Sequence, residues 1–158
     1  MKYLLAVVFG LITSTAFEPV SFWPSAFAGF AGWYFLLLRA RLGSKILISY
    51  LFGLSQILVV QHWTGIYVGS LPWLVLGCCQ ATFFILPAYF VGKSKRYNQF
   101  AFATSLVIVE LLLRTIPFTG FGWTRISFTQ VDSPLSSFYK IGGVVLVAFF
   151  ITELINCC

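Results

Sequence analysis

Two charged residues in an otherwise apolar stretch are the first candidates for chemistry. Glu110 and Arg114 are four residues apart in the run Glu-Leu-Leu-Leu-Arg, so on a helix their side chains share one face. A charge in apolar surroundings is costly unless it is paired or faces a polar cavity. We therefore predict a structural pair between Glu110 and Arg114. The alternative is that the Arg114 guanidinium binds a phosphate group.

The stretch that follows, residues 114–137, is the longest one rich in polar side chains, and its glycines and prolines permit tight turns. Polar side chains on a loop held by such turns are where binding sites are often found. Our candidates for contacts with a ligand are Trp123, Gln130 and Asp132, with Arg114 as a further one. The alternative interpretation is a solvated connector.

The other reactive residue types form no catalytic set. The sequence has no Gly-x-Ser-x-Gly or His-Glu-x-x-His motif and no glycine loop of the kind that cradles phosphate. The cysteines are two adjacent pairs, Cys78–Cys79 and Cys157–Cys158, without CxxC spacing. We predict no catalytic residue, no metal site and no cofactor, and we interpret the first cysteine pair as apolar packing residues.

The composition indicates where such a chain resides. Of 158 residues, 59% are hydrophobic, against about 45–50% in soluble proteins, and 9% are charged, against about 25%. The mean hydropathy is +0.94. Fourteen charged residues cannot cover a soluble domain of this size. We therefore predict a polytopic membrane protein, and we do not assign the net charge of +6 to nucleic-acid binding.

Six uncharged apolar runs are candidate membrane spans, because a helix of about 20 residues, or 17 at the lower limit, crosses the hydrocarbon layer. We expect residues 1–158 to form one all-α transmembrane domain whose long outer loop is 114–137. A signal peptide is the alternative for the first run, given Lys2 and Ser14-Thr15-Ala16. The predicted spans are residues 3–17, 22–38, 46–61, 71–91, 100–113 and 138–155.

The positions of lysine and arginine predict the orientation of these spans. Seven of the ten basic residues precede the first span or lie in the turns after the second and fourth, which are the turns at 39–45 and 93–96. The positive-inside rule therefore places both termini in the cytoplasm. His62, the only histidine, then lies at the outer interface beside Trp63, with a lipid-headgroup contact as the sharper alternative.

Several motifs in these outer connections match one known family in order and spacing. The sequence resembles the N-terminal transmembrane region of bacterial apolipoprotein N-acyltransferases over essentially its whole length. Phe128 and the Thr-Ile pair after Arg114 depart from residues common in that family. The matching motifs are Ala16-Phe17-Glu18-Pro19, Phe22-Trp23-Pro24, His62-Trp63 with Tyr67-Val68, Glu110 to Arg114, Phe118 to Trp123, Gln130-Val131-Asp132-Ser133-Pro134-Leu135 and Gly142-Gly143.

The resemblance implies a multi-pass protein of the bacterial inner membrane that works with lipids. The family transfers a fatty acyl chain from a phospholipid donor to the N-terminal cysteine amine of a lipoprotein acceptor. Its Glu-Lys-Cys catalytic set is on a nitrilase-like domain, and no residue of that set can be carried onto this chain. We therefore expect the membrane domain of a truncated chain, with the missing nitrilase-like catalytic domain as its partner. The alternatives are a catalytically inert membrane scaffold and a small transporter.

Overall fold

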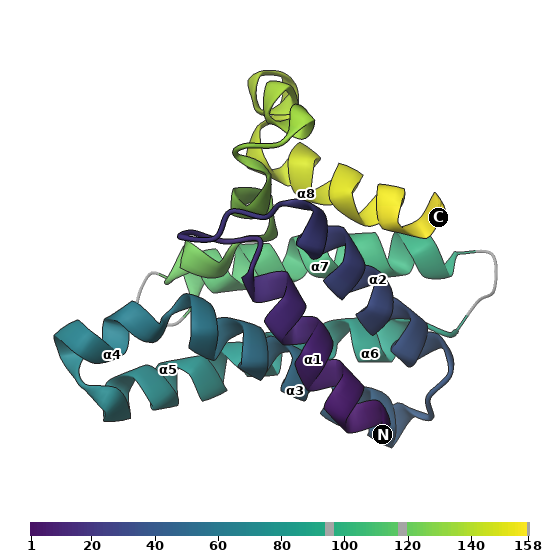
Figure 1. Ribbon diagram of the computed structural model, residues 1–158. Helices are drawn as coiled ribbons and strands as arrows, with labels where there is room; N and C mark the ends of the chain where they lie inside the picture. The colour runs from purple at the N-terminus through teal and green to yellow at the C-terminus, as the bar shows by residue number, and fades with distance from the viewer. Residues whose placement is uncertain (94–96, 117–119, 158) are drawn as a thin grey trace.

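The computed structural model describes the backbone of residues 1–93, 97–116 and 120–157, and the side chains in these ranges up to residue 151. Every regular element in these ranges is helical, and none of them contains a strand. Figure 1 shows α1 lying across α3 at the centre, the α4–α5 hairpin at one end, and α7 beside α8. The elements are α1 Lys2–Ser14, α2 Pro24–Leu38, α3 Leu42–Val60, α4 His62–Val68, α5 Ser70–Ala81, η1 Thr82–Ile85, α6 Leu86–Phe90, α7 Asn98–Thr115, η2 Gly122–Thr124, η3 Ile126–Gln130, η4 Pro134–Phe138 and α8 Tyr139–Cys157.

Within the described part of the chain, three helical stretches are long and apolar enough to cross a membrane. They are Leu42–Val60, Ser70–Phe90 and Pro134–Ile151, and the apolar helices Lys2–Ser14 and Pro24–Leu38 are shorter. The third stretch is bent at Gly143, whose backbone has φ 63° and ψ −159°. Each of the six predicted spans overlaps at least one helix. The number of crossings and the direction of the termini remain predictions.

Small residues allow α1 to pack closely on its two neighbours. A Cβ added to Gly10 in α1 would lie 2.5 Å from the carbonyl oxygen of Phe52 in α3. One added to Gly29 in α2 would lie 2.8 Å from the carbonyl oxygen of Phe9 in α1. Helices in membranes associate through such close backbone approach, because lipid offers no hydrophobic driving force between them.

A buried aromatic cluster joins the central helices. Trp33 of α2 stacks on Phe52 of α3 with ring centroids 4.3 Å apart and meets Phe102 of α7 edge-on at 5.3 Å. Its indole nitrogen donates a hydrogen bond to Ser49 Oγ at 3.3 Å, which satisfies the polar atom of this buried ring. The cluster ties α2, α3 and α7 into one core.

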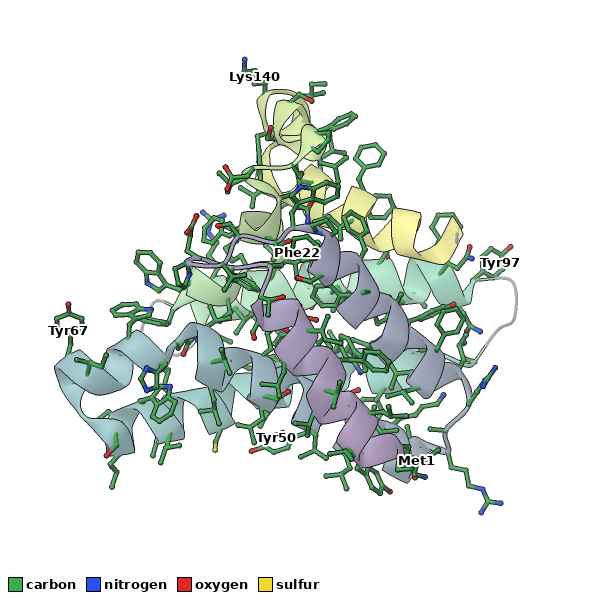
Figure 2. The ribbon with its side chains drawn as sticks, in the orientation of Figure 1. Met1, Phe22, Tyr50, Tyr67, Tyr97 and Lys140 are labelled. Atoms are coloured by element: carbon green, nitrogen blue, oxygen red, sulfur yellow. The ribbon has the colours of Figure 1, made fainter. Side chains whose placement is uncertain are left out.

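Two lysine contacts bring together segments that the charge pattern predicts to lie on the same side of the membrane. Lys2 Nζ donates to Ser44 Oγ at 2.8 Å, and Lys45 Nζ donates to the carbonyl of Val91 at 2.6 Å. The N-terminus, the start of α3 and the end of α6 are therefore neighbours. Figure 2 shows Tyr67 of α4 and Lys140 of α8 far from Met1 and Tyr97.

Candidate functional site

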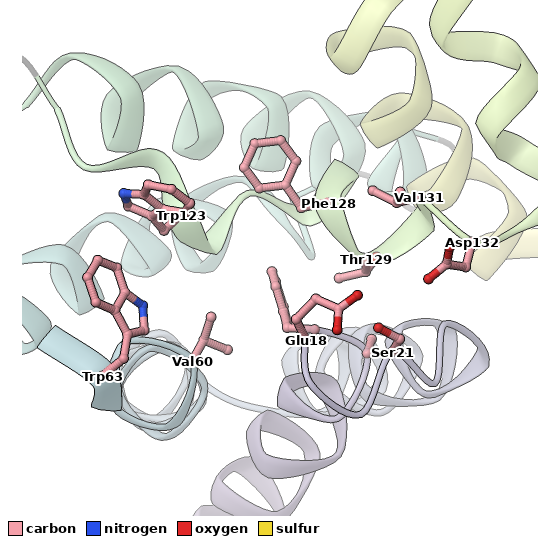
Figure 3. A pocket seen from close by; sticks show the side chains of 11 residues that line it. Glu18, Ser21, Val60, Trp63, Trp123, Phe128, Thr129, Val131 and Asp132 are labelled. Atoms are coloured by element: carbon pink, nitrogen blue, oxygen red, sulfur yellow. The ribbon is translucent and has the colours of Figure 1, made fainter.

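A cavity of about 470 Å³ lies where three separate connections of the chain meet. One wall comes from the turn after α1, one from the junction of α3 and α4, and one from the long segment between α7 and α8 (Figure 3). The lining residues are Ala16, Phe17, Glu18, Ser21, Val60, Trp63, Trp123, Phe128, Thr129, Val131 and Asp132. Residues far apart in sequence thus build one site.

The turn between α1 and α2 is closed by local hydrogen bonds. The amide of Phe22 donates to the carbonyl of Thr15 at 3.0 Å, and Thr15 Oγ1 donates to Ser25 Oγ at 2.8 Å. These bonds hold the two ends of the turn together. Glu18 and Ser21, between these ends, are thereby presented to the cavity.

The long segment is fixed to α7 through Glu110, which is only 2% exposed. One carboxylate oxygen of Glu110 accepts a hydrogen bond from the amide of Ser127 at 3.0 Å, and the other lies 3.8 Å from Arg125 Nη2. The hydroxyl of Tyr139 at the start of α8 donates to the carbonyl of Ser127. This anchor holds η3, which carries Phe128 and Thr129, against the bundle.

The ion pair of Glu110 differs from the one that the sequence predicts. Among the described residues its basic partner is Arg125, whereas Arg114 is exposed. The reason is the path of the backbone, which lies back against the end of α7 at Gly120 and Phe121. Phe121 returns far enough for its amide to donate to the carbonyl of Leu113 at 2.9 Å. The returning segment brings Arg125 to the carboxylate.

Gly120 makes that reversal possible. Its φ is +88°, and an added Cβ would lie 1.8 Å from the carbonyl oxygen of Arg114. Only glycine adopts such a conformation at little cost. Beyond it, Trp63 of α4 lies against Phe121 at 6.0 Å and edge-on to Trp123 at 5.7 Å between ring centroids. These three rings form an aromatic wall at one side of the cavity.

The five predicted ligand-binding residues are not all at the cavity. Trp123 and Asp132 line it. Gln130 is buried beside it and donates through Nε2 to Thr129 Oγ1 at 3.0 Å. Arg114 and His62 are exposed and do not line it, and the His62 ring lies edge-on to Trp73 at 5.4 Å. Their roles in binding remain predictions.

The structure adds lining residues that sequence reasoning did not select. Glu18 and Ser21 come from the first turn, and Trp63 comes from α4. One signal for Glu18 was available, since it is one of only four acidic residues in the chain. Figure 3 shows Glu18 on the wall formed by the first turn and Asp132 on the wall formed by the long segment. The described residues contain no group of three side chains that could hold a metal.

Comparison with known proteins identifies the family of this chain. The family model for the apolipoprotein N-acyltransferase N-terminal domain matches residues 9–158. The chain belongs to this family. The N-terminal domain family thus includes every residue of the cavity described above.

Curated relatives carry the same family name. The apolipoprotein N-acyltransferase of Haemophilus influenzae is 29% identical over 94% of this chain and 30% of its own length. That of Vibrio cholerae is 30% identical over 96% of this chain and 33% of its own length. That of Pseudomonas syringae pv. tomato is 33% identical over 92% of this chain and 32% of its own length. The chain spans about a third of the length of these relatives.

The site of this N-terminal domain suits an amphiphilic ligand better than a small polar one. Its walls include the apolar side chains of Phe17, Val60 and Val131, while Glu18 and Asp132 supply carboxylates. Pockets of about 300–1,000 Å³ with apolar walls and a few polar groups are typical of small-molecule sites. The cavity offers no residue set for covalent chemistry among its lining side chains.

Proposed function

We propose that this chain is the membrane domain of an apolipoprotein N-acyltransferase, an enzyme that transfers a fatty acyl chain from a phospholipid to the N-terminal cysteine amine of a lipoprotein. In this proposal the cavity receives the acyl part of a lipid substrate. The observation that carries the proposal is that three distant connections, at one end of their helices, build a single cavity with apolar walls. Family membership supports the class of substrate.

The proposed topology has six crossings, at residues 3–17, 22–38, 46–61, 71–91, 100–113 and 138–155, with both termini in the cytoplasm of a bacterial cell. The whole of residues 1–158 then forms one multi-pass domain in the inner membrane, with 114–137 as the outer loop. The lysine contacts of Lys2 and Lys45 support it, because they join three segments that the charge pattern assigns to one face.

The depth of the cavity follows from helix length. The 19 residues of α3 rise about 28 Å at 1.5 Å per residue, close to the hydrocarbon thickness of about 30 Å. Val60, the last residue of α3, lines the cavity. If α3 begins at the cytoplasmic interface, the cavity lies at the outer edge of the hydrocarbon layer, where acyl chains meet headgroups.

The predicted ligand-binding residues have distinct parts in this proposal. Trp123 and Asp132 contact lipid in the cavity, and Gln130 supports the wall behind Thr129. Arg114 and His62, both exposed, contact headgroups at the rim. The acyl transfer itself is assigned to a nitrilase-like domain of the type implied by the sequence resemblance, with phospholipid and lipoprotein as partners.

A chimera tests this function. Residues 1–158 replace the corresponding region of the Haemophilus influenzae relative in cells depleted of their own enzyme, and mass spectrometry of a lipoprotein N-terminus reports N-acylation. We expect the chimera to restore N-acylation. We expect Trp123→Ala to reduce it at least tenfold at an unchanged membrane level, while Phe35→Ala, an exposed position of α2 outside the cavity, has no effect. Absence of N-acylation at a normal membrane level would favour an inert scaffold.

A further inference from the structure

Two buried glutamines connect the two sides of the aromatic wall. Gln61, between α3 and α4, donates through Nε2 to Gln80 Oε1 of α5 at 2.6 Å. Gln80 in turn donates through its own Nε2 to the carbonyl of Phe121 at 3.0 Å. Both side chains are fully buried. The two amides form a continuous relay from the α3–α4 junction to the long segment.

The relay supplies hydrogen-bond partners for the buried amide atoms that it joins. A buried amide without partners costs free energy, so such groups are retained where they are paired. Gln80 uses both its oxygen and its nitrogen in the relay. Gln56, five residues before Gln61 and within α3, is equally buried, but neither of its amide atoms has a hydrogen-bond partner within the described part of the chain, whereas Gln61 lacks a partner only for Oε1. Gln56 is therefore a matched buried glutamine outside the relay.

The ends of the relay lie close in sequence to the two tryptophans of the wall. Gln61 is two residues before Trp63, whose ring contributes the α4 face. Phe121 is two residues before Trp123, whose ring packs edge-on against that of Trp63 in the same wall. The Phe121 backbone is held from both directions, since its amide donates to Leu113 and its carbonyl accepts from Gln80. The relay thus ties the backbone just before Trp123 to the helix junction just before Trp63.

We infer that Gln80, oriented by Gln61, is a positioning residue that fixes the aromatic wall of the cavity by holding Phe121 and Trp123 against Trp63. It acts through Phe121 and does not line the cavity itself. The binding of lipid against this wall rests on the proposed function. The positioning of the rings rests on the hydrogen bonds alone.

The experiment uses the 158-residue chain labelled with 5-fluorotryptophan in dioleoylphosphatidylcholine nanodiscs. Its five tryptophans give separate ¹⁹F signals, assigned by replacing each with phenylalanine in turn. The variants are Gln80→Leu, Gln61→Leu and the control Gln56→Leu. A second arm adds phosphatidylcholine spin-labelled on its acyl chain and follows the broadening of each signal.

We expect Gln80→Leu and Gln61→Leu to shift the Trp63 and Trp123 signals and to leave that of Trp33, in the central cluster, in place. Gln56→Leu should move neither wall signal. In the second arm, Gln80→Leu should raise the fraction of spin-labelled lipid needed for half-maximal broadening of Trp123 by about three- to tenfold, the range expected for one polar contact between helices in a membrane.

Unchanged Trp63 and Trp123 signals in Gln80→Leu would overturn the inference. If Gln80→Leu disturbs all five signals, Gln61→Leu decides, because it removes the donor that orients Gln80 and leaves the Gln80 side chain itself in place. A shift confined to the wall signals then supports positioning, and no shift overturns it. Non-saturable broadening of Trp123 in the unmodified chain, with the Gln80→Leu shift present, would contradict the proposed lipid site and leave the relay intact.

Discussion

At the scale of single residues, the path of the long segment depends on one glycine and one buried acid. Gly120 permits the reversal at the end of α7, and Glu110 holds the returning backbone. Both lie outside the cavity lining, yet they determine where Phe128 and Thr129 stand. Replacing either residue should therefore change the shape of the cavity, although neither residue lines it.

Gly120→Ala is expected to lower the free energy of unfolding by about 1–3 kcal/mol, because the added Cβ meets the Arg114 carbonyl and the left-handed φ is strained. Reversible unfolding in mixed micelles measures it. The control is Gly43→Ala in α3, where an added Cβ meets nothing within 4 Å. That change should be neutral or stabilising by up to about 1 kcal/mol. Equal stability of the two variants would contradict the described turn.

Glu110→Ala is expected to free the segment around Ser127, since a hydrogen bond from a backbone amide to a charged group is worth about 1.5–3 kcal/mol. Limited proteolysis with proteinase K should then cut within residues 121–138 at least several times faster. Arg114→Ala should leave the rate near that of the unmodified chain. Equal acceleration by both changes would contradict the Glu110–Arg125 pair and support the Glu110–Arg114 pair that the sequence predicts.

At the scale of elements, helix association depends on small residues rather than on large apolar contacts. Gly29 of α2 stands over the Phe9 carbonyl of α1 and next to Thr13, so a larger side chain there separates the two helices. Since the first connection of the cavity follows directly from α1, separation of α1 and α2 also opens the turn that carries Glu18.

Gly29→Leu is expected to cost about 1–3 kcal/mol through overpacking at the α1–α2 contact. Thermal denaturation in detergent, followed by loss of monomer on size exclusion, reports the change. Ala28→Leu, the adjacent and exposed position on the same helix, supplies the control and should leave the denaturation temperature within one or two degrees. A larger loss in Ala28→Leu than in Gly29→Leu would contradict the packing described.

The apolar composition predicted the all-helical fold, because hydropathy is a local property of the sequence, while the number of crossings and their orientation remain predictions. Residues 46–61 and 100–113, for example, fall within or almost within α3 and α7. The candidate site could be predicted from the sequence only in part. Trp123 and Asp132 were chosen as polar or aromatic loop residues, whereas Glu18 and Trp63 join them only through tertiary packing. Glu110 pairs with Arg125 and not with Arg114 because the backbone at Gly120 lies back against the end of α7. Helical spacing cannot reveal this return.

At the scale of the whole molecule, the proposed topology assigns the two ends of the helices to opposite sides of the membrane. Tyr67 is 81% exposed at the α4–α5 turn, and Arg41 is exposed between α2 and α3. In a chain whose four cysteines are replaced by serine, Tyr67→Cys should react with a membrane-impermeant maleimide in intact spheroplasts. Arg41→Cys should react only after permeabilisation. The reverse pattern would invert the orientation and place the cavity at the inner face.

The occupancy of the cavity by lipid is tested most directly by photo-crosslinking. The chain is placed in nanodiscs containing a phosphatidylcholine with a diazirine on its acyl chain, irradiated and digested, and the labelled residues are identified by mass spectrometry. We predict label concentrated on residues 16–21 and 123–132, above the yield at Leu74 and Val75, which are exposed on α5. Uniform labelling of the exposed apolar surface, with no excess at the cavity, would contradict the account.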